Sequence, residues 1–222
     1  MSLVSLQDLR TQARNRSDMR VNGIFTDADF NSAINAGIFE LYDLQVKCWG
    51  DNYFLTSSII PLTRSQTLYS LPAANTGSAG IYKLVGVDLQ STTGADWRSI
   101  HSYEFQDRNK RGAEMRYCLY GSGINLYPAP TTGQQIQVWY VPQPALLVSD
   151  TDTYDFTSGW QEYVILSTAI KALAAEESDT TVFERQLLQM RERIEDMAPK
   201  RDIGEPHAIV DVEQCSYWDQ YW

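Results

Sequence analysis

The chain has few residues that could bind a transition metal or form a disulfide: three cysteines and two histidines among 222 residues. Cys48, Cys118 and Cys215 lie far apart and in no CxxC or Cys/His spacing, so the sequence indicates neither a zinc site nor a disulfide framework. His101 and His207 have no nucleophile motif or metal-ligating partner nearby. We therefore expect reduced thiols, no metal, no cofactor and no histidine-based catalysis.

Long apolar runs are also missing. No stretch of about 18 apolar residues occurs, which is what a membrane-spanning helix requires. The first ten residues, MSLVSLQDLR, lack the apolar centre of a signal peptide. We expect a protein that is made in the cytosol and that does not contact a membrane.

Positive charge is scarce. The net charge is -10, which argues against duplex binding, because affinity for nucleic acid comes mainly from Lys and Arg that neutralise phosphates. Arg108-Asn109-Lys110-Arg111 is the one candidate basic patch, and a short run of this kind is typical of a solvated loop or a subunit contact. A hydrophobic content of 43% is enough for a globular core.

Two helices are predicted in residues 1–50. The first, from residue 5 to about 16, opens with Ser5 as the N-cap and Asp8 three positions later. The second opens at Thr26 and closes at Trp49-Gly50, and it carries one apolar face. The residues of that face are Phe30, Ile34, Ile38, Leu41 and Leu44.

Residues 51–150 alternate between apolar and polar side chains and contain many turn residues, which predicts short antiparallel strands. The expected strands are residues 53–61, 66–70, 81–90, 115–120, 124–127 and 134–140. Gly121-Ser122-Gly123 is expected to form a hairpin turn, and residues 99–112 a loop or short helical insertion. The pattern favours a small β-sandwich or barrel.

Residues 151–199 predict a helical hairpin, with helices at residues 158–175 and 180–197. The second helix has an apolar stripe formed by Phe183, Leu187, Met190, Ile194 and Met197. Pro199 ends the hairpin, and residues 200–222 show neither helical nor strand period, so an extended arm is expected. The predicted fold is α+β: a helical bundle from the N-terminal helices and the hairpin, an inserted β module, and a C-terminal arm.

The arm carries a dense aromatic cluster, formed by Tyr217, Trp218, Tyr221 and Trp222. Exposed aromatic clusters usually mark contacts, and the alternatives are docking on the protein's own domain or on a partner. The Gly204 and Pro206 before the cluster suit a segment that leaves the domain. We therefore expect the four aromatic residues to anchor the protein to a partner.

An enzymatic alternative is a carboxylate pair for glycoside cleavage, chosen from Glu104, Asp107 and Glu114. The separation of the carboxylates in space identifies such chemistry, and a sequence does not give it. In so acidic a chain, these side chains are expected mainly to contact solvent.

The order of helices, β module, helical hairpin and arm resembles the head-to-tail adaptor (connector) proteins of tailed bacteriophages, including the tail-tubular-A type. The resemblance rests on Phe39-Glu40-Leu41-Tyr42 to Trp49, Tyr69-Ser70-Leu71-Pro72, Tyr82-Lys83-Leu84-Val85-Gly86-Val87-Asp88, Arg116-Tyr117 through Tyr127-Pro128-Ala129-Pro130, Ile136-Gln137-Val138-Trp139-Tyr140-Val141-Pro142 and Glu176-Glu177-Ser178-Asp179. It covers most of the chain.

The resemblance implies a structural virion protein, made in the bacterial cytoplasm and located in the neck between head and tail. It implies a ring of twelve copies that binds the portal through the arm. The other side of the ring would bind the tail or nozzle proteins, and DNA would pass through the ring without specific binding. It implies no active site. The alternatives are an envelope-degrading, muramidase-like enzyme and a binding module elsewhere in a neck or tail.

Overall fold

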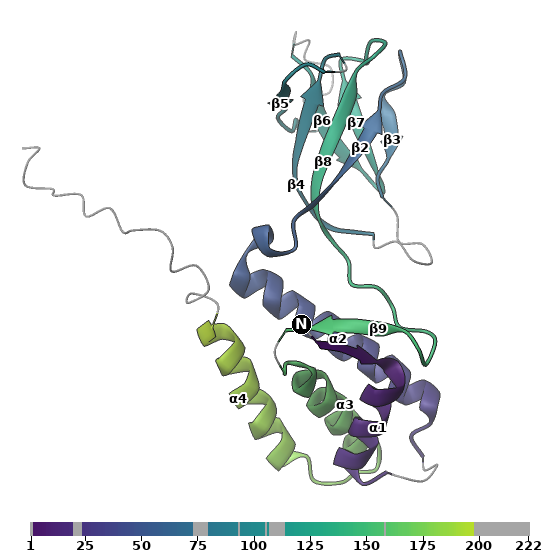
Figure 1. Cartoon of the computed structure of the whole chain (residues 1–222), viewed down its shortest axis with the longest axis vertical. Helices are drawn as coiled ribbons and strands as arrows, with labels where there is room; N and C mark the ends of the chain where they lie inside the picture. Colours follow the sequence, from purple (N-terminus) through teal and green to yellow (C-terminus); the bar gives the residue numbers. More distant parts are fainter. Residues whose placement is uncertain are drawn as a thin grey trace, which may run out of the picture.

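The computed structural model describes residues 2–19, 24–72, 80–92, 94–104, 106, 114–157 and 159–197. Within these residues the fold is α+β, as predicted, and the helices and the larger sheets occupy opposite ends of the molecule (Figure 1). We refer to helices α1 to α4 with the β1–β9 ribbon as the helical part, and to strands β2 to β8 as the β part.

The first two helices begin as their sequences predict. Helix α1 is Leu6–Ser17, and the backbone N–H of Asp8 donates to the Ser5 hydroxyl at 3.1 Å. Helix α2 is Asp27–Trp49 and opens with a full capping box, in which the Asp29 N–H donates to the Thr26 hydroxyl and the Thr26 N–H donates to the Asp29 carboxylate. Gly50, with φ of 75°, ends α2.

Replacing Thr26 with alanine is expected to lower the free energy of unfolding by about 1 kcal/mol, because the first turn of α2 loses its side-chain acceptor. Chemical denaturation followed by circular dichroism measures this loss. Thr26→Ser keeps the hydroxyl and serves as the matched control. Equal losses in the two variants would contradict the capping role.

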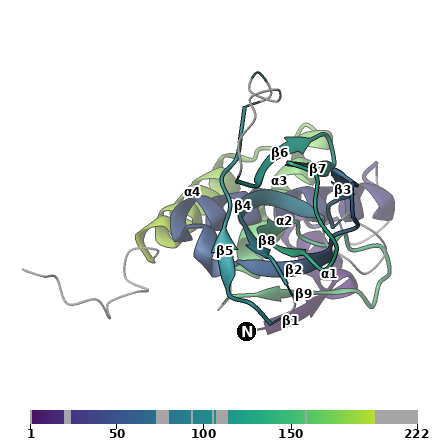
Figure 2. The same ribbon diagram turned by 90° about the horizontal axis from the view of Figure 1, so that it is seen from above.

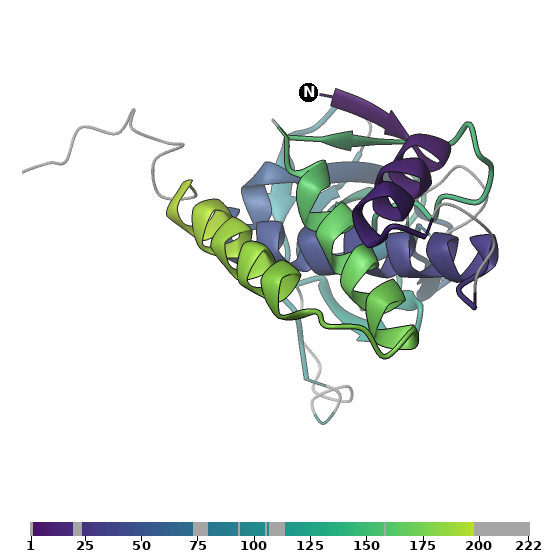
Figure 3. The same cartoon turned by 90° about the horizontal axis from the view of Figure 1, so that it is seen from below.

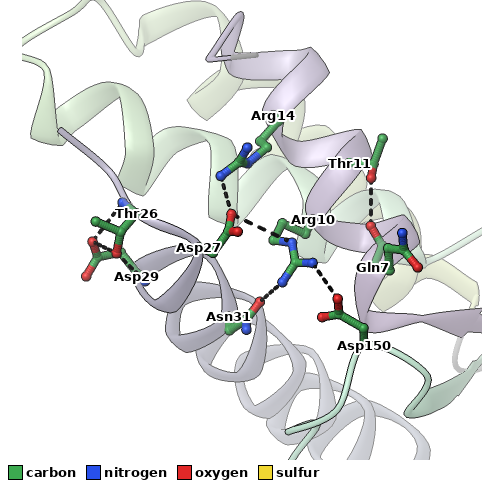
Figure 4. Close-up of polar contacts among 9 residues, drawn as sticks. All are labelled: Gln7, Arg10, Thr11, Arg14, Thr26, Asp27, Asp29, Asn31 and Asp150. Carbon is green, nitrogen blue, oxygen red and sulfur yellow. Dashed lines mark hydrogen bonds and ion pairs between the residues drawn. The ribbon is translucent and has the colours of Figure 1, made fainter. Parts of the chain in front are cut away.

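An arginine side chain joins α1 to its neighbours (Figure 4). Arg10 is only 14% exposed, and its guanidinium donates to Asn31 of α2 at 3.2 Å and to Asp150 at 3.0 Å. One turn later, Arg14 pairs with Asp27 at the start of α2. These bonds hold α1 across the first turns of α2, where both helices also bury apolar side chains.

Helices α3, Gln161–Ala175, and α4, Thr181–Met197, form the predicted hairpin. Helix α3 packs against α1, α2 and α4, and Figure 3 shows it between α1 and α4. It begins three residues later than predicted, because Gly159 adopts φ of 83° and Trp160 forms a turn before the first helical residue. The helices and the ribbon share one apolar core.

The predicted stripe of α4 is buried only in its middle. Met190 and Ile194 are buried and Leu187 is partly buried, whereas Met197 is 43% exposed. On the polar face of the helix, Arg191 and Glu195, one turn apart, form an ion pair at 3.1 Å. Helix α4 thus contacts the core through only a few of the side chains on its apolar face.

One small sheet was not expected from the sequence. Strand β1, Ser2–Ser5, pairs antiparallel with β9, Thr153–Phe156, and places Val4 and Phe156 in the helical core. Each strand has four residues, and the partners are about 150 positions apart in sequence. No local pattern marks a pairing of that kind.

The β part contains two antiparallel sheets (Figure 2). The first has the order β2-β8-β4-β5, with bounds Thr56–Pro61, Gln135–Pro142, Ile81–Gln90 and Trp97–Ser99. The second has the order β3-β7-β6, with bounds Leu68–Ser70, Gly123–Tyr127 and Arg116–Tyr120. Both sheets contribute buried side chains to one cluster, and the described strands do not close into a barrel.

Two predictions for the β part need correction: the start of its first strand and the start of the insertion. The strand expected from residue 53 starts at Thr56, because Asp51–Tyr53 forms a 3-10 turn (η1) directly after α2. The insertion expected at residues 99–112 begins at the end of strand β5, which pairs with β4, and Ser102 then bridges to Tyr117 of β6. Residues 105 and 107–112 of that insertion lie outside the described part of the chain.

Asp152 organises the connection before β9. Its carboxylate accepts from the backbone N–H groups of Val148 and Ser149, both at 2.8 Å, and these bonds lower the pKa of Asp152 below its ordinary value of 3.8. A carboxyl group with a lowered pKa stabilises the fold above its unfolded-state pKa, and this contribution is lost as pH falls through the folded-state pKa.

Asp152→Asn is therefore expected to lower the unfolding temperature at neutral pH. The difference in unfolding temperature between the variant and the unmodified protein should narrow as pH falls below 3.8. Thermal unfolding at a series of pH values measures this difference. The matched control is Asp96→Asn, at an exposed position next to β5. A pH-dependent difference of the same size in that control would contradict the assignment to Asp152.

Candidate functional site

The predicted anchor residues, Tyr217, Trp218, Tyr221 and Trp222, lie outside the described residues, as do the Arg108-Asn109-Lys110-Arg111 run and Pro199. The structure therefore bears on this prediction through the place where the described chain ends, at Met197 of α4. The surroundings of that point define the candidate site.

The last turns of α4 lie beside the end of α2. Ile194 is fully buried in the helical core, and Cys48 packs against the same core. Burial raises the pKa of the Cys48 thiol, and the nearby Glu195 carboxylate raises it further. The described end of α4 therefore lies near the C-terminal end of α2, where the chain passes from the helical to the β part (Figure 1).

Aromatic and apolar side chains fill the junction between the two parts. Tyr42 of α2 packs with Val46, Phe54 and Val141, and its hydroxyl donates to the backbone carbonyl of Pro142. Burial raises the pKa of Tyr42 well above its usual range. The junction is therefore a packed contact between the helical and β parts.

Polar side chains cross the same junction. The Lys83 ammonium pairs with Asp51 at 2.7 Å, and the Tyr82 hydroxyl bonds to Asp43, which raises the pKa of Tyr82. Lys83 and Tyr82 belong to β4, whereas Asp51 and Asp43 belong to η1 and α2. These bonds add to the aromatic packing in fixing the β part on the end of α2.

A series of aromatic rings connects the junction to the helical core. Ring centroids lie 4.5 Å apart for Tyr42 and Phe54, 4.4 Å for Phe54 and Tyr53, 4.5 Å for Tyr53 and Trp49, and 4.6 Å for Trp49 and Trp160. The Trp49–Tyr53 and Tyr53–Phe54 pairs are edge-to-face, an arrangement that is favourable beyond the area it buries. The end of α2 and η1 is therefore a rigid aromatic support.

Beside this support lies an open cavity of about 520 Å³, which we call the junction cavity. Its apolar lining is Tyr42, Tyr53, Phe54, Pro142, Pro144 and Tyr154. Its polar lining is Gln45, Gln143, Asp155 and Thr157. Burial raises the pKa of Tyr154 to about 12. Its hydroxyl, like that of other tyrosines, can donate a hydrogen bond.

The junction cavity was not predicted from the sequence. Its lining comes from α2, from η1 with the residue that follows it, from the last residue of β8 with the two that follow it, and from β9 with the residue that follows it. These segments meet only in the folded chain. The one local signal was the adjacent pair Tyr53-Phe54 directly after α2.

The described residues show no arrangement that favours the enzymatic alternative. Glu104 and Glu114 are both exposed, and Asp107 lies outside the described part of the chain. The backbone carbonyl of His101 accepts from the Tyr117 N–H at 3.1 Å, which places His101 in the pairing next to β6. Within the same described residues, no group of three or more His, Cys, Asp or Glu could hold a metal ion.

The helices that the structure describes also bear on the membrane question. None of them is both long and apolar enough to cross a bilayer.

Comparison with known proteins adds the family. A search of curated proteins finds no match for this chain. Residues 4–209 match the model of the SU10 adaptor protein family, a range that includes all four described helices and both larger sheets and that ends before Tyr217. The match points to a structural, non-enzymatic role. Because it covers most of the chain, this protein belongs to the SU10 adaptor protein family, a family of structural adaptor proteins of bacteriophages.

Proposed function

We propose that this protein is the head-to-tail adaptor of a tailed phage, of the tail-tubular-A-like type, located in the virion neck. In this role it forms a ring below the portal, lets DNA pass and provides the surface to which tail or nozzle proteins attach. The observation that carries the proposal is the family match over residues 4–209. The order of elements on which the resemblance rests, helices, then antiparallel strands, then a pair of helices, is the order of the described elements.

The portal contact is assigned to Tyr217, Trp218, Tyr221 and Trp222. Aromatic residues are enriched among those that dominate binding energy at interfaces. The family match ends at residue 209, so this assignment rests on the composition of the arm and not on the family. The sequence between Met197 and Tyr217 is long enough to place the rings well away from α4.

Ring formation requires heterologous contacts, in which one face of a subunit meets a different face of the next. Helix α4 has apolar side chains that its own fold leaves open to solvent, since Val182 is 61% and Leu188 is 55% exposed. Leu146 and Val148, at 62% and 80% exposed, lie on the connection before β9. These side chains are candidates for contacts between neighbouring subunits in a ring of twelve copies.

Passage of DNA is compatible with the net charge of -10. An acidic channel wall repels phosphate, whereas a basic wall would bind DNA with a steep dependence on salt. The proposed channel therefore needs no specific DNA contact.

A co-purification experiment tests the proposal. Tagged portal complex from the same phage is expected to retain this protein, and the retained complex is expected to bind the tail or nozzle proteins in turn. Portal complex that retains neither this protein nor the tail proteins through it would contradict the adaptor role.

A further inference from the structure

We infer that the junction cavity is a resting site for the aromatic residues of this chain's own arm, Tyr217 to Trp222, which they occupy before the portal is met. This inference rests on the proposed function and deepens it, since it assigns a second position to the segment proposed to bind the portal. The occupant is the same chain and not a neighbouring copy.

The chemistry of the cavity fits large aromatic side chains. Its volume of about 520 Å³ lies within the range of about 300–1,000 Å³ found for ligand pockets. Grooves lined by aromatic side chains are used to bind extended peptides. Tyr42, Phe54 and Tyr154 provide such a surface here.

The polar atoms of the cavity match the polar atoms of the arm. Tyr and Trp side chains each carry one hydrogen-bonding group, which needs a partner once the ring is buried. Gln45, Gln143 and Asp155 line the cavity and carry amide or carboxylate oxygens that can accept those bonds. A purely aliphatic ligand would leave these groups unpaired.

The arm starts close to the cavity. The last turns of α4 lie beside Cys48 at the end of α2, and Tyr53 and Phe54 of the cavity follow that end by a few residues. The stretch from Ala198 to Tyr217 can extend to at most about 70 Å, which is long enough to bring the rings from the end of α4 to the cavity. Attachment on one chain also gives the rings a high effective concentration at the cavity.

The consequence is protection of the anchor before assembly. Exposed aromatic clusters favour unspecific association, and a cavity that holds them reduces this exposure. The portal would then compete with the junction cavity for the same rings.

Disulfide trapping tests the resting site, because Cys215 lies two positions before Tyr217. Asp155→Cys places a thiol in the cavity lining at an exposed position. Asp96→Cys places one at an exposed position directly before β5, a strand that lies away from the helices in Figure 1. After mild oxidation, peptide mapping by mass spectrometry separates these bonds from those of Cys48 and Cys118. Gln143→Cys provides a second cavity position should Asp155→Cys fail to fold.

The expected result is an intramolecular bond from Cys215 to position 155 that forms much faster than the bond to position 96, at a rate independent of protein concentration. Adding Trp218→Ala and Trp222→Ala should slow the bond at position 155 and leave the bond at position 96 unchanged, and an unchanged rate at position 155 would overturn the inference. Equal rates at positions 155 and 96, or bonds formed only between two chains, would overturn the inference. Co-purification with the portal is scored separately, so failure of the resting site is distinguishable from failure of the adaptor role.

Discussion

Replacing Tyr217, Trp218, Tyr221 and Trp222 together with alanine is expected to abolish binding of this protein to the portal. The four rings are the densest aromatic cluster in the arm, and an anchor residue at an interface commonly contributes about 2 kcal/mol or more, which is roughly 30-fold in Kd for one ring. When all four anchor residues are lost, the remaining affinity for the portal is expected to be too weak to measure. Surface binding measurements on immobilised portal complex test this expectation.

The matched control replaces all four residues with phenylalanine, which keeps the rings and removes the hydroxyl and indole N–H groups. This variant is expected to retain weakened binding. Both variants are expected to keep the far-UV circular dichroism spectrum of the folded protein, because the two largest core clusters are formed by side chains between Val4 and Ile194. Full portal binding by the alanine variant would contradict the anchor role.

Replacing Trp160 with alanine is expected to lower the free energy of unfolding by about 3–5 kcal/mol, the usual loss for a buried tryptophan. Trp160 is 1% exposed, belongs to the helical core, and packs on Trp49 at a centroid distance of 4.6 Å. A loss of this size is a large share of the about 5–15 kcal/mol that stabilises a typical domain. Urea denaturation followed by circular dichroism measures it.

Two variants control for this effect. Trp160→Phe is expected to lose much less, because a ring still fills the site and the buried indole N–H has no hydrogen-bond partner among the described residues. Val182→Ala, at a position 61% exposed, should change stability by no more than about 0.5 kcal/mol. A Trp160→Ala loss as small as that of Val182→Ala would show that the helical core does not depend on this ring.

The sequence was most informative where the signal is local. Ser5 with Asp8 and Thr26 with Asp29 place polar side chains at a fixed spacing before an apolar helical face, and both helices begin where these residues predict. The alternation in residues 81–90 predicts strand β4 with its observed bounds. In such segments the neighbouring residues alone decide the backbone conformation.

What could not be predicted depends on contacts between distant residues. The pairing of β1 with β9, the order β2-β8-β4-β5 and the junction cavity all join segments separated by tens of residues or more. The 3-10 turn at Asp51–Tyr53 replaces the start of a predicted strand because the chain must turn between α2 and the β part. The resemblance to phage adaptors is confirmed at the level of the family, and the tail-tubular-A-like type stays a prediction.

Mass measurements of this protein, alone and then mixed with portal complex, test whether it assembles as a ring on the portal. We expect the mass of a single chain for the protein alone. In the mixture we expect the mass of one portal complex with a ring of adaptor subunits, twelve in number. A mixture in which the portal mass stays unchanged would contradict ring assembly on the portal.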